Sequence, residues 1–158
     1  MKYRDLNGFE CRLSFEKGKS CIKSRHVIVL AQYEGKWLLT DHPVRGLEFP
    51  GGKRERGETL EEAAVRETYE ETGGVLKSLK WVGEYKVMAE RPFVKTAFLA
   101  IVERLEKIPL AETRGAVLVK ELDFNDRYSF LMKDEGMKEL IRIAVFEHKK
   151  ARQEPGSS

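Results

Sequence analysis

The sequence predicts a mixed α+β layered domain, and three observations lead to this prediction. The length of 158 residues suits one domain, several segments have the composition of strands, and two segments have helical periodicity. Strands and helices do not alternate strictly, which favours an α+β arrangement of packed layers. We expect one domain over residues 1–150 and a flexible C-terminal tail over residues 151–158, which are small and polar.

The predicted strands are segments rich in β-branched, apolar or aromatic residues. The four longer ones are Phe9–Phe15, His26–Tyr33, Leu79–Val87 and Thr96–Val102, and the shorter candidates are Trp37–Thr40, Leu47–Phe49 and Ala116–Val119. Glu34-Gly35 lies between two of these segments and is typical of a hairpin turn. We therefore expect the strands on either side of this turn to pair antiparallel.

The predicted helices differ in how clearly their ends are marked. The first runs from Leu60 to Thr72, where Thr59 as N-cap and Glu62 form a capping box and Gly73-Gly74 ends the helix. The second runs from about Ser129 to Lys150. Its apolar residues recur at helical spacing, so one face is expected to pack against another part of the protein; they are Leu131, Leu140, Ile141, Ala144 and Val145.

Composition excludes several classes of protein. No apolar run approaches the roughly 20 residues that span a bilayer, and the first residues lack the apolar stretch of a signal peptide. Cys11 and Cys21 form no disulfide framework, so we expect reduced thiols in a cytoplasmic protein. Residues 1–25 hold seven Lys or Arg against three acids, whereas residues 51–75 hold four against seven. This asymmetry would suit cations at a central site and polyphosphate or RNA arriving from outside.

The first helix carries an unusual acidic face. Glu67, Glu70 and Glu71 stand at i, i+3 and i+4 and so lie on one face, where like charges repel. Two interpretations are open: a solvated acidic face, or a site for hard divalent cations such as Mg²⁺ or Mn²⁺, which prefer oxygen ligands.

The residues before this helix favour the second interpretation. Phe49-Pro50-Gly51-Gly52-Lys53 ends a short strand in a tight turn, where glycine lets the backbone approach a ligand closely. The following loop supplies Lys53, Arg54 and Arg56, which could hold phosphate oxygens, and Glu58 adds a fourth carboxylate. A glycine turn, a basic loop and an acidic helix are the parts that phosphate chemistry needs.

These residues resemble the Nudix box of the Nudix hydrolases. Gly52 is followed after five residues by Glu58, and after seven more by Arg66-Glu67-Thr68-Tyr69-Glu70-Glu71-Thr72-Gly73, in register with the family pattern. The flanking residues 49–53 and 57–59 resemble the MutT branch in particular. Thr68 and Gly74 depart from the pattern, because the family has aliphatic residues at these two packing positions.

The resemblance implies a Nudix fold, in which a mixed β-sheet is sandwiched between helices and the box forms a loop-helix-loop. It also implies hydrolysis of a nucleoside diphosphate linked to another moiety, with two or more Mg²⁺ or Mn²⁺ ions. The implied metal ligands are Glu67, Glu70 and Glu71, together with a backbone carbonyl of Gly51 or Gly52. Arg66 would brace the carboxylates through Glu58.

The proton acceptor is left open among Glu58, Glu71 and Glu112. Family members often use an extra carboxylate outside the box; Glu112 is the first candidate, and Glu103, Glu106 and Glu121 compete with it. The alternative for Glu112 is an ordinary surface acid. Lys53 and Arg54 are expected to help hold the outgoing phosphate.

Over its whole length the chain resembles a smaller group, the YtkD-like enzymes of Bacillus. This likeness implies cleavage of nucleoside triphosphates, including oxidised purine nucleotides such as 8-oxo-dGTP, or removal of pyrophosphate from 5′-triphosphate RNA. A nucleoside-diphosphate-sugar hydrolase and a non-catalytic nucleotide sensor remain as alternatives. We expect a nucleotide polyphosphate as the ligand and neither a membrane nor an obligate protein partner.

Overall fold

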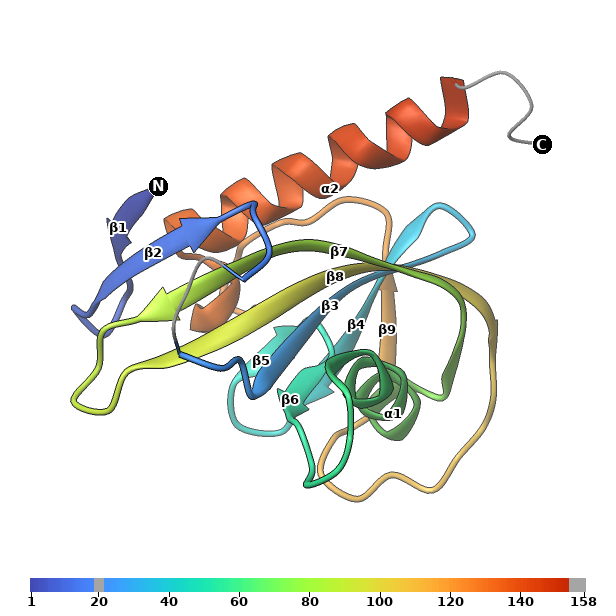
Figure 1. Ribbon diagram of the computed structural model, residues 1–158. Coiled ribbons are helices and arrows are strands. Elements are labelled where there is room, and N and C mark those ends of the chain that lie inside the picture. Colours follow the sequence, from blue (N-terminus) through green and yellow to red (C-terminus); the bar gives the residue numbers. More distant parts are fainter. Residues whose placement is uncertain (19–21, 154–158) are drawn as a thin grey trace.

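Residues 1–18 and 22–153 are described by a computed structural model, with side chains described as far as Lys150. Lys19, Cys21 and residues 154–158 lie outside the described part. The described strands form one nine-stranded sheet in the order β1-β2-β7-β8-β3-β4-β5, with β6 paired to β3 and β9 paired to β4 (Figure 1). The bounds are β1 Lys2–Arg4, β2 Glu10–Ser14, β3 His26–Tyr33, β4 Lys36–His42, β5 Gly46–Glu48, β6 Gly51–Lys53, α1 Leu60–Thr72, β7 Gly74–Val87, β8 Phe93–Leu105, β9 Ala116–Val119, the 3₁₀ turn η1 Phe130–Met132, and α2 Glu135–Gln153.

The sheet lies between the two α-helices, as expected (Figure 1). α1 packs on one face through Ala63 and Ala64, which are fully buried in a cluster with Val29. α2 packs on the other face through Leu140 and Ala144. The sheet is mixed, because β3 pairs parallel with β8 and antiparallel with β4. No helix in the described part of the chain is long and apolar enough to cross a membrane.

The predicted bounds of α1 are confirmed, because local chemistry fixes both of its ends. The Glu62 N–H donates to Thr59 Oγ1 at 3.0 Å, and the Thr59 N–H donates to Glu62 Oε1 at 3.1 Å. At the other end Gly73 adopts φ +77°, a left-handed conformation that favours glycine. A Cβ at Gly73 would also clash with the Glu106 carbonyl. The Nudix-like segment is thus a loop followed by a well-capped helix.

The predicted start of the second helix is wrong. Ser129 caps the short turn η1 instead, through a 3.2 Å hydrogen bond from the Leu131 N–H, so Leu131 is not part of α2. α2 begins at Glu135, where Asp134 accepts the Met137 N–H at 2.7 Å in the manner of an N-cap. The helix also continues to Gln153, three residues into the predicted tail.

Most strand predictions are confirmed, with differences at the edges. His26–Tyr33 and Ala116–Val119 have the predicted bounds, and the hairpin at Glu34-Gly35 pairs β3 with β4 antiparallel. β7 starts five residues earlier than predicted, directly after α1. The sequence did not predict β1, which is three residues long, or β6, which is formed by the glycine turn itself.

Candidate active site

The site is built where β6 passes the side of α1. A Cβ at Gly51 would clash with the Val27 carbonyl of β3, and a Cβ at Gly52 would lie 2.5 Å from Glu67 Oε1. Position 51 therefore needs glycine for the strand to fit against β3, whereas a side chain at position 52 would displace the Glu67 carboxylate. The Gly51 N–H donates to Glu71 Oε2 at 3.1 Å, which ties the last carboxylate of the helix to this strand.

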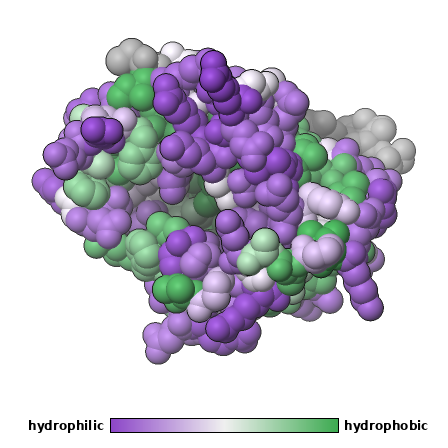
Figure 2. Space-filling view, turned by 90° about the horizontal axis from the view of Figure 1, so that it is seen from below, coloured by the Kyte–Doolittle hydropathy of each residue, from purple (hydrophilic) through white to green (hydrophobic). Residues whose placement is uncertain are grey.

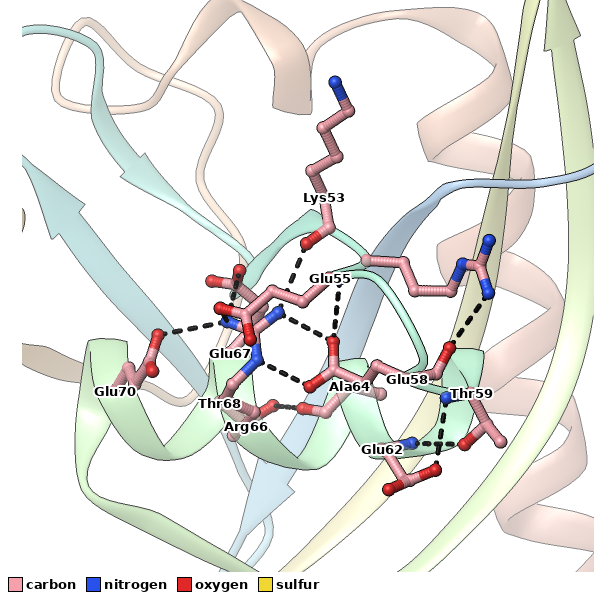
Figure 3. A network of polar contacts seen from close by, with 11 residues as sticks. Lys53, Glu55, Glu58, Thr59, Glu62, Ala64, Arg66, Glu67, Thr68 and Glu70 are labelled. Carbon is pink, nitrogen blue, oxygen red and sulfur yellow. Dashed lines mark hydrogen bonds and ion pairs between the residues drawn. The ribbon is translucent and has the colours of Figure 1, made fainter.

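Arg66 lies at the centre of the polar contacts around the box (Figure 3). Its Nε and Nη2 donate to the two carboxylate oxygens of Glu58 at 2.7 and 2.9 Å, a bidentate pair. Its Nη1 donates to Glu67 at 3.0 Å and to Glu70 at 3.2 Å. Its Nη2 also donates to the Lys53 carbonyl at 3.2 Å. One guanidinium thus joins the loop, the strand end and the acidic face of α1.

Glu58 is held as an anion inside the loop. The Arg66 hydrogen bonds and the Glu55 N–H, which donates at 3.0 Å, lower the pKa of Glu58 to about 2. Arg54 donates to the Glu58 carbonyl at 3.0 Å and closes the same loop. The pKa of the Arg66 guanidinium is raised in turn, mainly by Glu58. Both carboxylate oxygens of Glu58 are therefore occupied by hydrogen bonds from Arg66.

The pKa values of Glu67 and Glu71, the two carboxyls of α1 that are largely buried, are raised rather than lowered. Burial raises the pKa of Glu71 to about 8; the Gly51 N–H opposes this shift, while the charges of Glu67 and Glu48 add to it. Burial also raises the pKa of Glu67, against the favourable contact with Arg66. Glu70 is exposed. Two clustered carboxyls that resist ionisation are a place where a cation would be strongly stabilising.

A cleft of about 650 Å³ lies between α1 and the loop that follows β8. Glu112 lines this cleft together with the three glutamates on the acidic face of α1. The charge of Glu112 is among those that raise the pKa of Glu67. The rival Glu106 is bound by Tyr69, and Glu103 pairs with Arg104. The lining residues are Glu55, Arg66, Glu67, Tyr69, Glu70, Glu71, Ile108, Pro109, Ala111, Glu112 and Thr113. Seen from below the view of Figure 1, the molecule is mostly hydrophilic around a central hollow (Figure 2).

The loop that carries Glu112 is fastened at both ends. At its start the Tyr69 hydroxyl donates to Glu106 Oε1 at 2.8 Å, and the Glu106 N–H donates to the Gly73 carbonyl at 2.9 Å. At its end the hydroxyls of Thr113 and Thr40 share a short hydrogen bond. Thr40 Oγ1 also lies 3.3 Å from the carbonyl oxygen of Glu71, to which it donates. Sequence reasoning missed these contacts, since no spacing in the chain relates β4 to this loop.

The strand register distinguishes between the two glycine carbonyls. Pro50 and Arg54 hydrogen-bond to β3 through their main chains, and in an antiparallel pair such residues alternate with ones that face away. The main-chain N–H and C=O of Gly52 therefore point toward β3, whereas those of Gly51 and Lys53 point away from β3 and toward α1. There the Gly51 N–H donates to Glu71, and the Lys53 carbonyl accepts from Arg66. The register favours Gly51 over Gly52 as the carbonyl turned toward the carboxylates.

The donor set fits hard divalent cations in its chemistry. Three carboxylates and a backbone carbonyl are the oxygen ligands that Mg²⁺ and Mn²⁺ prefer. Among the described residues, no group of three or more His, Cys, Asp or Glu side chains already stands close enough together to hold a metal. Arg66 instead contacts Glu67 and Glu70.

Comparison with known proteins gives the family. A family model described as the NUDIX domain matches residues 23–140. The chain belongs to the Nudix family. Nudix hydrolases generally need divalent metal ions. The Nudix match runs from just before β3 into the first two turns of α2 and includes the whole box and Glu112.

Individual relatives agree with the Nudix assignment. The chain is 45% identical over 139 residues to "Putative 8-oxo-dGTP diphosphatase YtkD" of Bacillus subtilis (strain 168), covering 84% of this chain and 88% of that protein. The crystal structure of a mutant of the Bacillus subtilis pyrophosphohydrolase BsRppH superposes with a TM-score of 0.88 at 41% identity, covering 94% and 97% of the two chains. A NUDIX hydrolase from Nitrosomonas europaea shares the fold, with a TM-score of 0.60 at 19% identity over 80% of this chain and 91% of that one.

Proposed function

We propose that this chain is a metal-dependent pyrophosphohydrolase that cleaves the polyphosphate of nucleoside 5′-triphosphates, including 8-oxo-dGTP, or of 5′-triphosphate RNA. The observation that carries the proposal is that Glu67, Glu70 and Glu71 of the box line one cleft together with Glu112. The names of two relatives, an 8-oxo-dGTP diphosphatase and a pyrophosphohydrolase, support this reaction class.

The side chains that would hold the ions are Glu67, Glu70 and Glu71, with the Gly51 carbonyl as a further oxygen ligand. Divalent ions bound there would neutralise charge on the polyphosphate and make a water molecule more acidic. Arg66 holds Glu67 and Glu70 on the cleft side of α1 and anchors them to Glu58. Its role in the reaction is to keep the carboxylates in place.

The proton acceptor follows from how each carboxylate is engaged. Glu58 is a poor base, because Arg66 binds both of its oxygens and holds its pKa at about 2. Glu71 is a proposed metal ligand and also accepts a hydrogen bond from the Gly51 N–H. Glu112 is exposed in the cleft across from the helix. We therefore assign proton removal from the attacking water to Glu112.

Lys53 and Arg54 are placed differently with respect to the leaving phosphate. The exposed side chain of Lys53 points away from α1 and is free to meet an anion (Figure 3). Arg54 Nη1 donates a hydrogen bond to the Glu58 carbonyl, so this side chain also stabilises the loop. We therefore propose Lys53, ahead of Arg54, as the side chain that binds the outgoing phosphate.

The test is a substrate panel with Mg²⁺ and with Mn²⁺, read by product analysis. It compares GTP, dGTP, 8-oxo-dGTP, a triphosphorylated RNA and a nucleoside-diphosphate sugar. Glu112→Gln should lower kcat by about 10²-fold or more, the usual contribution of a positioned base, and should remove the acidic limb of the pH–rate profile. Glu61→Gln is the matched control, since Glu61 is exposed in the first turn of α1 outside the cleft. A wild type that cleaves none of the triphosphates would refute the proposal.

A further inference from the structure

Glu48 of β5 is a carboxylate with very little access to solvent. Its exposed fraction is 9%, and no other Asp, Glu, Lys, Arg or His in the described part of the chain is as little exposed. Arg45 binds both of its oxygens, through Nη2 at 2.7 Å and Nε at 3.1 Å. A buried ion pair adds little to stability, because removing two charges from water costs about as much as their attraction contributes. The Arg45–Glu48 pair therefore needs an explanation other than folding.

The turn before β5 fixes Arg45 relative to Glu48. His42 Nδ1 accepts the Arg45 N–H at 3.0 Å, which closes the turn. Gly46 then adopts φ +93°, a left-handed conformation, and a Cβ at this position would clash with the Arg127 carbonyl. The backbone thus holds the pair at i and i+3, with the Arg45 side chain 38% exposed and Glu48 inside.

Two sets of contacts place the Arg45–Glu48 pair next to the proposed metal ligands. The pair and Gly51 line the same hollow of about 130 Å³, and the Gly51 N–H donates to Glu71 at 3.1 Å. Thr40 lies opposite Glu48 in the register of β4 and β5, and its hydroxyl donates to the Glu71 carbonyl at 3.3 Å. Besides burial, which is the main cause, the charge of Glu48 helps to raise the pKa of Glu71. The charge at position 48 therefore acts on the site.

The two members of the pair act on a bound cation with opposite sign. The negative charge of Glu48 attracts the cation and the positive charge of Arg45 repels it. Salt screens charges that are largely buried less than it screens surface charges. Because Arg45 binds both oxygens of Glu48, this carboxylate keeps its charge near the site without joining the ligand set.

We propose that the Arg45–Glu48 pair sets the affinity of the site for divalent ions: Glu48 attracts them from outside the ligand set, and Arg45 holds Glu48 there and weakens the attraction. The inference rests on the proposed function, because it assumes that the ions bind at Glu67, Glu70 and Glu71. Neither member of the pair is a metal ligand or a catalytic residue. Arg45 is a positioning residue, since it acts through Glu48.

The experiment is a calorimetric titration of the full chain with Mn²⁺ in the absence of nucleotide. Glu48→Gln should raise the Kd for Mn²⁺ roughly three- to tenfold, and Arg45→Met should lower it by a similar factor. The double variant should return to within about twofold of the wild type, because the two charges are removed together. Arg45→Lys keeps the charge and should bind Mn²⁺ as the wild type does.

The matched control is a second pair with the same i and i+3 spacing. Arg142 of α2 donates to Glu139 through Nε at 3.0 Å and Nη2 at 2.6 Å, at an exposed position outside the cleft and the hollow. Glu139→Gln and Arg142→Met should leave the Kd for Mn²⁺ unchanged.

A pair that only supports the fold would give a different pattern. Both single variants would then bind Mn²⁺ more weakly and the double variant would not recover, and this result or an unchanged Kd in every variant would overturn the inference. Where melting in EDTA shows that Arg45→Met does not fold, the double variant must still bind more tightly than Glu48→Gln. A wild type that binds no Mn²⁺, with or without nucleotide, would instead refute the proposed metal site, and the role of the pair with it.

Discussion

The buried carboxyl of Glu71 predicts an unusual pH dependence of stability in the metal-free protein. Its pKa is about 8 in the folded chain, against an ordinary value of 4.5. Between these values the native state holds a proton that the unfolded chain has lost. Folding therefore takes up a proton, and the contribution of Glu71 to stability falls as pH rises from 4.5 to 8.

The magnitude follows from the gap between the two values. Each unit of pKa difference corresponds to about 1.4 kcal/mol, so the difference between 4.5 and about 8 sets an upper bound of about 5 kcal/mol on the contribution of Glu71 to the free energy of unfolding. Glu71→Gln is neutral at every pH and can still accept the Gly51 N–H through its amide oxygen. The variant should match the wild type near pH 5 and exceed it in melting temperature by roughly 10 °C near pH 8.5, taking 2–4 °C per kcal/mol for a chain of this size.

The assay is thermal unfolding of both proteins in EDTA at several pH values from 5 to 8.5. The difference between the two curves reports Glu71 together with its charge coupling to Glu67 and Glu48, because the other titrating groups are common to both proteins. Parallel melting curves across this range would refute the reasoning, as would a variant that is less stable at pH 8.5. Glu61→Gln again serves as the control and should follow the wild type at each pH.

Four further predictions concern cations, turnover and the cleft loop. A hundredfold excess of Mn²⁺ over its Kd should stabilise the wild type by about 2.7 kcal/mol, and calorimetry showing no binding with or without nucleotide would contradict this. Glu70→Gln should lose turnover by orders of magnitude with its fold intact; full activity would remove it from the ligand set. Thr113→Val should lower kcat more than it changes KM, with Thr113→Ser restoring it, because the hydroxyl fixes the loop of Glu112; equal effects of both variants would reject this role. Neutralising Lys17 and Lys23 should flatten the salt dependence of RNA cleavage and leave that of GTP unchanged, and identical slopes would exclude the basic N-terminal segment from RNA binding.

The parts of the fold that were predictable are those with local chemical signals. α1 was predicted to the residue because a capping box and a glycine with positive φ mark its ends. The start of α2 was missed because the apolar spacing runs back through Leu131, which belongs to η1. The decisive signal was Asp134, an N-cap hidden among charged neighbours. β6 was missed because its glycines have no strand propensity and are held by β3.

The two departures from the Nudix pattern, Thr68 and Gly74, are neighbours in the packing of α1 against the sheet. Thr68 is fully buried, and its hydroxyl donates to the Ala64 carbonyl at 2.8 Å within the helix. A Cβ at Gly74 would lie 3.3 Å from the Thr68 methyl and 3.1 Å from Leu38. The space that an aliphatic side chain at position 74 would need is thus already filled. The residues that fill this space are Thr72, Leu38 and Thr68.

For the site, the sequence predicted which carboxylates gather and could not predict how they differ. Spacing along a helix places Glu67, Glu70 and Glu71 on one face, but it carries no information about burial. The depth of Glu71 depends on β6, and the engagement of Glu58 depends on a loop closed by Arg54. These are contacts between elements, so they emerge only from the fold.

Arg66 explains why carboxylates of one box have such different properties. Its guanidinium donates hydrogen bonds to Glu58, Glu67 and Glu70. Glu71 has instead one backbone N–H and three acidic neighbours. Glu71 is therefore the carboxylate whose ionised form a cation at the proposed site would stabilise most. If Glu71 is a metal ligand, as we propose, Arg66 keeps the neighbouring carboxylates together without ions, and ionisation of Glu71 should be coupled to metal binding.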